Sequence, residues 1–320
     1  MPKILIIRLS SIGDIFHTFT VLPDIKKALP DCQIDWLVDE SFKSVAQLSP
    51  LIDNVISIPL RKWKKNKFTW ILNLIKFKNT LPRTKYDYII DTQGLIKSAF
   101  LAKLLFNGKI YGLDKSSARE PIANLFYDYK FKVCQDNVAV IRLRGLIAKI
   151  FNLEHDLSDF SFDVMRQNLE INSQNGYILF LHGTSKENKK WPLEDWITLS
   201  NWIIINTKYD IMLTYSKNTE FEFANKLNAS INDQRVRIID KLDFLQLTDL
   251  IANAKLIIGV DTGFTHMANL LKKPTLAIYL YSRPGYVGML ESHIAHNFGG
   301  YKKQVKPAEL IEFINLNNLI

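Results

Sequence analysis

Hydrophobic and polar positions along this chain form two alternating kinds of block. Short apolar runs of strand length are followed by longer stretches whose apolar residues recur every three or four positions, as on one face of a helix. The runs that predict strands span residues 4–9, 34–38, 55–58 and 88–91 in the first half, and 177–181, 210–214, 236–239, 256–260 and 275–279 in the second. This alternation predicts an α/β protein with one open parallel sheet in each half.

Chain length and one polar stretch predict the domain organisation. The 320 residues exceed the usual size of a single hydrophobic core. Residues 152 to about 175 are polar and acidic, which is typical of a linker. We therefore predict an N-terminal Rossmann-like domain over 1–155, a linker over 156–171 and a C-terminal Rossmann-like domain over 172–305. Residues 306–320 have a helical pattern, and we expect this helix to pack back on the first domain.

Composition narrows the class of protein. Hydrophobic residues make up 47% of the chain and are spread over its whole length, as in a globular protein. No apolar run approaches the roughly 18 to 20 residues that span a bilayer, and the first residues lack the pattern of a signal peptide. The two cysteines, Cys32 and Cys134, lack metal-type spacing and suit a reducing compartment. These observations predict a cytoplasmic protein, either soluble or peripheral to a membrane.

The positive charge is concentrated in the first half. Residues 1–150 hold 24 Lys and Arg against 13 Asp and Glu, a net charge of +11, whereas residues 151–320 hold 17 against 19, a net charge of −2. This asymmetry indicates an anionic partner for the N-terminal domain, which could be nucleic acid, an anionic lipid surface or a phosphorylated substrate. A basic surface that serves only solubility is the alternative.

Ligands of open α/β sheets bind where strands end and loops lead into helices. The loop after the first predicted strand contains Ser10, Ser11, Gly13, Asp14 and His17. Gly13 permits a close backbone approach. Asp14 lies near a helix start, where an aspartate is favoured as a cap but could also accept a proton from an attacking hydroxyl. Both interpretations of Asp14 remain open.

Two loops in the second half suit a diphosphate. Asp261, Thr262 and Gly263 end a buried strand and lead into a helix that contains His266. The backbone N–H groups and the dipole at such a helix start attract anions, although a lone histidine is more often a packed side chain. The loop after residue 181 offers further groups for phosphate contacts, unless it is simply a solvated basic loop. These groups are Thr184, Ser185 and Lys189.

A cationic run surrounds Trp63. It contains Arg61, Lys62, Lys64 and Lys65. Such a run could bind phosphates or an anionic leaflet, and a nucleic-acid patch could look the same. Helix-turn-helix, zinc-finger and RNP patterns are absent from the sequence, which argues against nucleic acid.

Several familiar catalytic motifs are also missing. The sequence has no G-x-G-x-x-G, Walker A, H-E-x-x-H or G-x-S-x-G pattern. Nor does it have the Asp-x-Asp pair with which many sugar-nucleotide enzymes hold a divalent metal. We therefore expect neither a metal nor another cofactor.

Four motifs in this order resemble the ADP-heptose:lipopolysaccharide heptosyltransferases of glycosyltransferase family 9, more closely type I than type II. They are Ser10-Ser11-Ile12-Gly13-Asp14 with His17-Thr18, Asp91-Thr92-Gln93-Gly94-Leu95-Ile96-Lys97-Ser98, Ala118-Arg119-Glu120-Pro121, and Asp261-Thr262-Gly263 with His266. The resemblance covers nearly the whole chain and implies the GT-B fold, in which two Rossmann-like domains face a cleft. The chain departs from the family after Tyr279, where Leu280-Tyr281-Ser282-Arg283-Pro284 replaces the frequent Gly-Pro-Thr.

The resemblance also implies a role for each matching residue. Asp14 corresponds to a general base. Donor contacts would come from Thr184, Ser185 and Lys189 to phosphate and sugar, Glu220 to ribose, Leu242 to adenine, and Asp261, Thr262, Gly263 and His266 to heptose and diphosphate. Acceptor contacts would come from Ser10, Ser11, Gly13, His17, Arg61, Lys62, Lys64, Lys65, Gln93, Lys97 and Arg119.

The function implied by the resemblance is inverting transfer of heptose from ADP-L-glycero-D-manno-heptose to a Kdo residue of Kdo-lipid A. The N-terminal domain would bind the acceptor and the C-terminal domain the ADP-sugar. The enzyme would be a monomer at the inner face of the inner membrane of a Gram-negative bacterium, without a nucleic-acid partner. The alternatives are heptosyltransferase II, another heptosyltransferase with a different acceptor, and a non-catalytic nucleotide- or nucleic-acid-binding module.

Overall fold

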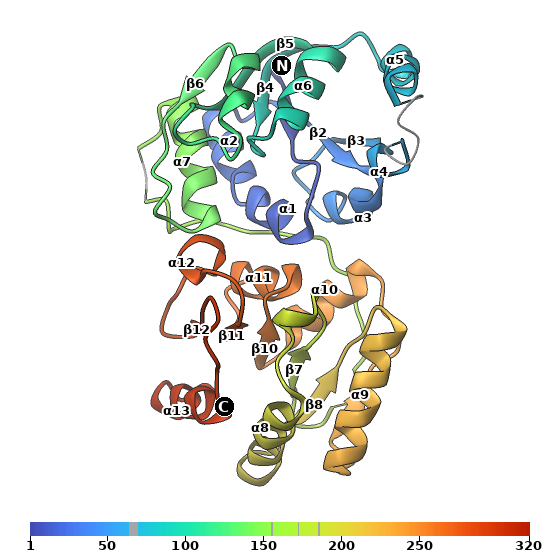
Figure 1. The fold of residues 1–320 in the computed structure, drawn as a ribbon, viewed down its shortest axis with the longest axis vertical. Coiled ribbons are helices and arrows are strands. Elements are labelled where there is room, and N and C mark those ends of the chain that lie inside the picture. Colours follow the sequence, from blue (N-terminus) through green and yellow to red (C-terminus); the bar gives the residue numbers. More distant parts are fainter. Residues whose placement is uncertain (64–69, 155, 172, 185) are drawn as a thin grey trace. The chain divides into compact units, whose positions relative to one another are not determined.

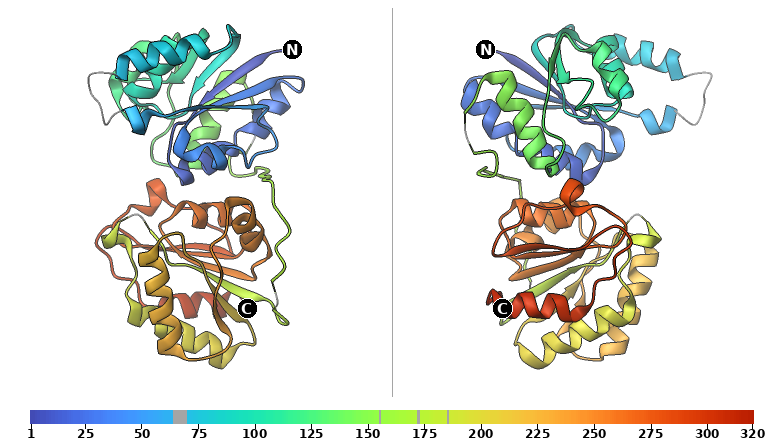
Figure 2. Two further views of the ribbon diagram at one scale, coloured as in Figure 1. Left: turned by 90° about the vertical axis from the view of Figure 1, so that its right-hand side faces the viewer. Right: turned by 60° about the vertical axis from the view of Figure 1, so that its left-hand side comes forward.

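The computed structural model describes residues 1–63, 70–154, 156–171, 173–184 and 186–320. It divides into two compact units, unit 1 (Met1–Asp163) and unit 2 (Val164–Ile320). In each unit, helices cover a parallel sheet (Figure 1, Figure 2). The predicted α/β class with two parallel sheets is therefore confirmed. The division after Asp163 falls inside the segment expected to be the linker.

The sheet of unit 1 has strand order β3-β2-β1-β4-β5-β6. Its six strands within the described residues are β1 (Lys3–Ile7), β2 (Gln33–Asp39), β3 (Asn54–Ile58), β4 (Lys85–Asp91), β5 (Asn107–Leu113) and β6 (Tyr129–Phe131). The helices are α1 (Ile12–Phe19), α2 (Leu22–Ala28), η1 (Glu40–Phe42), α3 (Lys43–Ala46), α4 (Leu60–Trp63), α5 (Trp70–Thr80), α6 (Ile96–Leu105), η2 (Pro121–Phe126) and α7 (Ala139–Phe151).

Unit 2 repeats this topology, because its sheet order β12-β11-β10-β7-β8-β9 is the same order read from the other edge. Its strands in the described part of the chain are β7 (Tyr177–Leu181), β8 (Asp210–Leu213), β9 (Val236–Ile238), β10 (Leu256–Val260), β11 (Thr275–Tyr279) and β12 (Ala295–Gly299). Its helices are η3 (Glu187–Lys189), α8 (Leu193–Asn206), α9 (Asn218–Ile231), α10 (Phe244–Asn253), α11 (Gly263–Leu270), α12 (Pro284–Val287) and α13 (Pro307–Leu316).

The central strands are buried on both faces. All five residues of β7, β10 and β11 are buried, as are four of the five in β1. Parallel strands covered by helices on both sides need continuous apolar runs rather than alternation. These runs are the reason that the sequence predicts the central strands, whereas β5, β6 and β12 have interrupted patterns and escape prediction.

Helix α13 belongs to unit 2. Leu310 and Ile314 are fully buried in the core cluster that also contains Trp196 and Leu199 of α8. Just before the helix, the Val305 carbonyl accepts a 2.9 Å hydrogen bond from the indole N–H of Trp191. The expectation that residues 306–320 pack back on the first domain is wrong, because Leu310 and Ile314 of this helix pack into the core of unit 2.

One buried ion pair fixes the end of unit 1. The Arg144 guanidinium on α7 contacts both carboxylate oxygens of Asp24 at 2.8 Å. It also donates to the backbone carbonyls of Asp156, Leu157 and Asp159. Because these carbonyls precede the boundary of the units, Arg144 anchors the start of the linking segment to unit 1.

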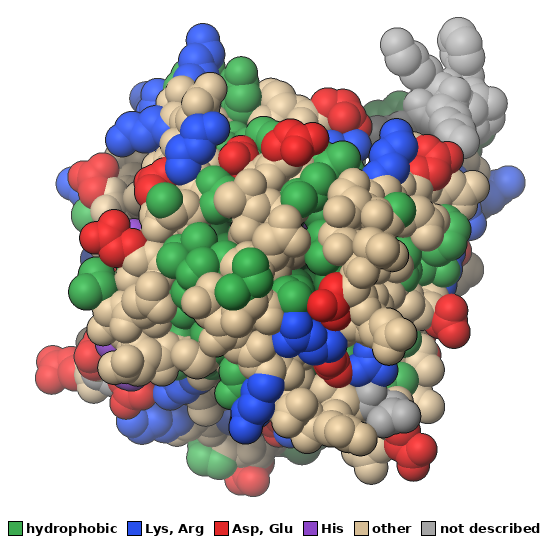
Figure 3. Space-filling view, turned by 90° about the horizontal axis from the view of Figure 1, so that it is seen from below, with side chains coloured by type: hydrophobic (Ala, Val, Ile, Leu, Met, Phe, Trp, Pro, Cys, Tyr) green, Lys and Arg blue, Asp and Glu red, His purple; other side chains and the backbone are tan. Residues whose placement is uncertain are grey.

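The surface carries charges of both signs. Lys and Arg side chains, Asp and Glu side chains and exposed hydrophobic side chains all occur on the face drawn in Figure 3. In the part of the chain that the structure describes, no helix is both long enough and apolar enough to cross a membrane.

Candidate active site

The candidate residues of each unit lie where its sheet order reverses. In unit 1 the reversal separates β1 from β4, and their register pairs Ile7 with Asp91. In unit 2 it separates β10 from β7, and their register pairs Gly259 with Leu181. Loops that leave such a switch point diverge and open a crevice at the carboxyl ends of the strands. The register therefore brings together loops that are about 80 residues apart in the sequence.

Asp14 occupies the first turn of α1, three residues after the N-cap Ser11. Its Oδ2 accepts hydrogen bonds from the Ser11 amide at 3.0 Å and the Ser11 hydroxyl at 2.9 Å. Its Oδ1 lies 2.8 Å from Arg8 Nη2. The side chain remains 37% exposed. Asp14 thus has the capping contact weighed from the sequence and is also accessible to a ligand.

The surroundings of Asp14 favour its ionised form. Burial alone raises the pKa of this carboxyl. The Arg8 guanidinium, the hydrogen bonds from Ser11 and the charge of His17 outweigh that effect and hold the pKa well below its usual range. Asp14 is therefore a carboxylate at neutral pH, able to accept a hydrogen bond from a bound hydroxyl.

His17 lies on α1, three residues after Asp14. Its side chain is buried, with 5% of the residue exposed, and it influences the charge state of Asp14. The charge of the His17 imidazole lowers the pKa of the Asp14 carboxyl. The expected contact of His17 with an acceptor stays a prediction.

A second loop of unit 1 is organised by buried Asp91. Its carboxylate accepts hydrogen bonds from Ser98 Oγ and from the Tyr127 hydroxyl, each at 2.7 Å, and from the Gln93 amide at 2.9 Å. Burial raises the pKa of Asp91, against these hydrogen bonds. Gln93 in turn accepts from the Leu9 amide at 2.9 Å through Oε1. The Asp91 network therefore holds Gln93 against the end of β1.

The loop that contains Arg119 joins this group. Gly94 adopts a φ of +65°, and a Cβ there would lie 3.4 Å from the Arg119 nitrogen. The Glu120 amide donates to the Gly94 carbonyl at 3.0 Å, and Glu120 Oε2 accepts from the Ile96 amide at 2.7 Å. The exposed Arg119 side chain and the half-buried Lys97 at the start of α6 are thus near the same strand end.

Arg61 and Lys62 are exposed on α4 and already have carboxylate neighbours. Arg61 Nε lies 3.8 Å from Asp39 Oδ1, and Lys62 Nζ lies 2.7 Å from Glu40 Oε2. Asp39 ends β2 beside Leu9, to whose carbonyl its amide donates at 3.1 Å. The predicted acceptor residues Ser10, Ser11, Gly13, Gln93, Lys97, Arg119, Arg61 and Lys62 therefore lie in loops and helix starts at one edge of the sheet. Lys64 and Lys65 are outside the described residues.

In unit 2 the groups converge on Asp261, immediately before α11. Lys189 Nζ lies 2.5 Å from Asp261 Oδ2, and His266 Nε2 lies 3.8 Å from Asp261 Oδ1. The Ser282 hydroxyl also donates to Oδ2. Thr184 Oγ1 donates to the Asp261 backbone carbonyl at 3.2 Å. Side chains from the loops after β7, β10 and β11 thus meet at one carboxylate.

The Asp261 carboxyl is also ionised. Burial raises its pKa, but the hydrogen bonds from His266, Lys189 and Ser282 and the charge of Lys189 hold the pKa well below its usual range. Thr262 caps α11 and Gly263 is its first residue. The cluster therefore combines a cation, hydroxyl donors and a helix N-terminus, all of which stabilise a bound anion.

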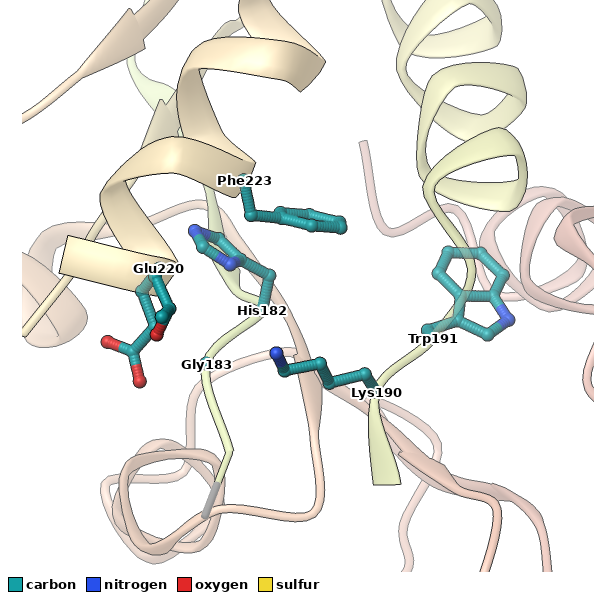
Figure 4. A pocket seen from close by; sticks show the side chains of 7 residues that line it. His182, Gly183, Lys190, Trp191, Glu220 and Phe223 are labelled. Carbon is teal, nitrogen blue, oxygen red and sulfur yellow. The ribbon is translucent and has the colours of Figure 1, made fainter. Parts of the chain in front are cut away.

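A small pocket lies beside this cluster (Figure 4). It is lined by His182, Gly183, Lys190, Trp191, Thr219, Glu220 and Phe223. The His182 ring stacks on Phe223, with centroids 5.0 Å apart and planes at 27°. A Cβ on Gly183 would lie only 2.7 Å from the Glu220 carboxyl carbon, so the missing side chain leaves room for this carboxylate beside the strand end.

The pocket contains a hydrogen-bonded carboxylate, Glu220, and a buried histidine, His182. Glu220 Oε2 accepts hydrogen bonds from the amide of Ser216 at 2.7 Å and from its hydroxyl at 2.8 Å. Burial lowers the pKa of His182 to about 4, so its ring is neutral at pH 7 despite nearby Glu220. Leu242 lies half-buried in the loop between β9 and α10, at the same edge of the sheet. Ser185 is outside the described residues.

Comparison with known proteins identifies the family. The model of the family described as "Glycosyltransferase family 9 (heptosyltransferase)" matches residues 74–310. The chain belongs to glycosyltransferase family 9. It is 32% identical over 290 residues to lipopolysaccharide heptosyltransferase 1 of Salmonella typhimurium, covering 89% of this chain and 90% of that protein. Its identity to the Pseudomonas aeruginosa protein of the same name is also 32%, with 89% and 81% covered.

Solved structures of family 9 enzymes share the fold. The structure titled "E. coli heptosyltransferase WaaC with ADP" superimposes with a TM-score of 0.85 at 29% identity, covering 98% of this chain and 99% of that one. E. coli ADP-heptose lps heptosyltransferase II matches with a TM-score of 0.76 at 20% identity, covering 99% and 98%, which shows the fold alone. The predicted GT-B fold and the predicted heptosyltransferase class are confirmed. Family 9 membership therefore favours an enzyme over a non-catalytic binding module.

Two residues of the candidate site are not predicted from the sequence. Arg8 lies in the run predicted as a strand over residues 4–9 and looks there like part of the core, yet its guanidinium contacts Asp14 and the Thr92 carbonyl. Ser282 lies in the segment that departs from the family after Tyr279, yet its hydroxyl reaches Asp261. A charged residue at the end of a buried strand was the available signal for Arg8. Ser282 had none, because its contact depends on the path of the loop after β11.

Proposed function

We propose that this enzyme transfers heptose from ADP-L-glycero-D-manno-heptose to a Kdo residue of Kdo-lipid A, in the assembly of the lipopolysaccharide inner core. Family 9 membership and the relatives named lipopolysaccharide heptosyltransferase 1 support the reaction class. The structure titled "E. coli heptosyltransferase WaaC with ADP-2-deoxy-2-fluoro heptose", at 29% identity, supports the donor. Unit 2 would bind the ADP-sugar and unit 1 the acceptor.

The observation that carries the proposal is the cluster around Asp261. Lys189, His266 and the start of α11 bring a cation, an imidazole and backbone N–H groups to one point. When the bond between the anomeric carbon and the diphosphate breaks, negative charge grows on the departing ADP. Groups already oriented toward that charge stabilise the transition state, each by about 3 to 4 kcal/mol. Asp261 would hold Lys189 and His266 in place and bind hydroxyls of the heptose.

The nucleoside half of the donor would occupy the neighbouring pocket. The Glu220 carboxylate accepts hydrogen bonds and can take them from the two hydroxyls of a ribose. Leu242 would cover the adenine with an apolar side chain. Thr184 and Ser185 would contribute hydroxyls to the phosphates. This arrangement provides for each chemical part of an ADP-sugar without using a divalent metal, since Lys189 and the α11 N-terminus neutralise the diphosphate.

Asp14 would be the general base. The acceptor hydroxyl of Kdo would donate its proton to the Asp14 carboxylate while its oxygen forms a bond to the anomeric carbon and the bond to ADP breaks. A single displacement of this kind inverts the configuration at that carbon. The cations of unit 1, namely Arg61, Lys62, Lys64, Lys65, Lys97 and Arg119, would bind carboxylates and phosphates of the acceptor. Ser10, Ser11, Gly13 and Gln93 would complete that contact.

Because the proposed acceptor is a lipid, the enzyme would have to work at a membrane surface. We propose that the enzyme is a cytoplasmic monomer that works at the inner face of the inner membrane, held there by the basic side of unit 1. Near an anionic leaflet each Lys or Arg contributes on the order of 1 kcal/mol of attraction. Several such charges would suffice for reversible attachment.

Mass spectrometry of the reaction product tests this proposal. The purified enzyme is incubated with ADP-heptose and Kdo-lipid A in EDTA, with lipid A that lacks Kdo as the control acceptor. We expect ADP release and the mass of one added heptose on Kdo-lipid A, and no product with the control. Transfer only to an acceptor that already carries heptose would replace the proposed acceptor, and strict dependence on added Mg²⁺ or Mn²⁺ would overturn the metal-free mechanism.

A further inference from the structure

Helix α5 lies at the rim of unit 1 (Figure 1). It exposes an apolar stripe of three side chains. Ile71, Leu72 and Ile75 are 54%, 58% and 49% exposed. With 3.6 residues per turn, these three side chains share one side of the helix. Phe77, on the opposite side, packs against the core of unit 1, and Leu74, between the two faces, is buried in the same core. The helix is therefore attached to the fold by one face and presents a second apolar face outward.

Lysines border this stripe. In a helical projection Lys76 lies beyond Leu72 on one side, and Lys78 lies beyond Ile71 on the other. Both are exposed. An apolar strip bordered by cations is typical of helices that lie in the plane of a membrane interface, where the apolar side chains enter the acyl boundary and the cations meet lipid phosphates.

Every charged residue in the surrounding sequence is positive. Residues 54–86 contain nine Lys and Arg and no Asp or Glu. Two of these cations, Arg61 and Lys62, lie on α4, whose Trp63 packs edge to face on Phe77 of α5 with ring centroids 5.8 Å apart. The contact between Trp63 and Phe77 thus places the α4 cations and the apolar stripe on neighbouring helices. Arg83 and Lys85 follow at the other end of α5.

We propose that the outer face of α5 docks on the surface of a bilayer rich in anionic lipids, with Ile71, Leu72 and Ile75 inserted and Lys76 and Lys78 at the phosphates. This inference rests on the proposed membrane contact of the enzyme and names the element that makes it. Hydrophobic burial supplies the short-range attraction, and the acid-free stretch supplies the long-range attraction. Neither alone gives more than marginal binding.

The charge pattern separates this occupant from others. A second copy of the chain would bring two acid-free cationic stretches together, and like charges repel. A nucleic acid would satisfy the lysines, but three exposed aliphatic side chains offer it neither stacking nor hydrogen bonds. A surface that is both anionic and apolar within a few ångströms of its charges contacts the lysines and the aliphatic side chains of α5 together.

Vesicle co-sedimentation of the full chain tests the proposal. The probes are vesicles of phosphatidylcholine alone and vesicles that also contain phosphatidylglycerol. The test variant combines Ile71→Gln, Leu72→Gln and Ile75→Gln. Its matched control combines Ile205→Gln and Leu316→Gln, which replace aliphatic side chains on unit 2 that are 80% and 73% exposed.

We expect the unaltered enzyme and the control to bind the anionic vesicles, and the test variant to bind at least about tenfold more weakly, since three inserted side chains are lost. The variant with Lys76→Gln and Lys78→Gln should bind more weakly and with less dependence on salt. Equal binding by the test variant and the unaltered enzyme would overturn the proposal. A dimer in light scattering, or RNA binding, that disappears in the test variant would overturn it in favour of that partner.

The result of the vesicle experiment does not depend on whether the enzyme transfers heptose. ADP binding, followed as a shift of the melting temperature, should be unchanged in the α5 variants, because none of the altered residues belongs to the ADP-sugar site. If the enzyme transfers heptose but the α5 variants bind vesicles normally, the docking proposal fails alone. If the vesicle results are as expected but no transfer occurs, the proposed reaction fails alone.

Discussion

Arg8 Nη2 lies 2.8 Å from Asp14 Oδ1, so the side chain directly after β1 is paired with a carboxylate on the helix that follows. Arg8 is buried and also donates to the Thr92 carbonyl. The cation is therefore fixed between the β1 and β4 loops. This pair keeps Asp14 ionised and reduces its affinity for a proton, which determines how the proposed base responds to pH.

Replacing the proposed base should separate chemistry from binding. In Asp14→Asn the side-chain oxygen can still accept a hydrogen bond from the Ser11 amide, so the cap on α1 survives. We expect heptose transfer to fall about 10²- to 10⁴-fold, the usual contribution of a general base, with ADP binding and melting temperature nearly unchanged. Steady-state kinetics and a thermal shift assay measure both. Near-normal turnover would remove Asp14 from this role.

Removing the Arg8 charge should change the pH profile. In Arg8→Met the coulombic effect that lowers the pKa of Asp14 is lost, while burial still raises it. Because a base must be deprotonated, the acid limb of kcat/KM should move to higher pH than in the unaltered enzyme. Arg8→Lys keeps a positive charge and is the matched control. The same acid limb in both variants would show that Arg8 does not tune Asp14.

Lys189 should act mainly on the departing diphosphate. We expect Lys189→Met to lower kcat about 10²-fold, in the range measured when one preorganised donor is lost, and to weaken ADP binding as well. Lys226→Met, on the exposed side of α9, removes a lysine of unit 2 away from the cluster and should leave both unchanged. Normal kcat in Lys189→Met, with only a higher KM for the donor, would restrict this lysine to ground-state binding.

His182 predicts a loss of stability in mild acid. Its pKa is lowered from 6.5 to about 4 in the folded protein, so the unfolded chain takes up the proton first. Above pH 6.5 His182 is neutral in both states and costs no stability. As the pH falls from 6.5 toward 4, protonation of His182 in the unfolded chain lowers the free energy of unfolding by up to about 3 kcal/mol. His182→Asn cannot titrate but can still donate to the Thr214 carbonyl. Urea unfolding at several pH values should show a weaker pH dependence in this variant, whereas His293→Asn, at an exposed site, should behave like the unaltered protein. Identical slopes in all three would contradict the assignment.

The buried ion pair between Arg144 and Asp24 should stabilise unit 1 against unfolding. Both side chains are buried, so Arg144→Met leaves the Asp24 carboxylate without its partner and should cost about 3 to 5 kcal/mol. The double variant with Asp24→Leu should recover part of this loss, since no buried charge remains. Denaturant unfolding of the single and double variants measures the difference. A double variant no more stable than Arg144→Met would mean that the contacts of Arg144 with the linking segment dominate.

Prediction from the sequence was most successful where residues close in the chain determine the outcome. The apolar runs of β1, β7, β10 and β11 predict buried parallel strands because their side chains must leave water on both faces. The loop that contains Asp14 and the turn that contains Asp261 are recognisable as strand ends followed by helix starts. The family resemblance carried by these motifs was sufficient for the fold and the enzyme class.

Other features depend on contacts between distant segments. Whether α13 covers unit 1 or unit 2 depends on which apolar surface is left uncovered, and that surface exists only once α8 is packed. The contacts of Lys189 and Ser282 with Asp261 depend on where loops from different strands meet. Strand register decides those meetings, because one residue of slippage would turn each side chain to the other face of the sheet. The chain by itself thus determined its central strands and the kinds of chemical groups at the strand ends, because these depend on residues close in sequence, while tertiary packing decided the outer strands and which of those groups touch.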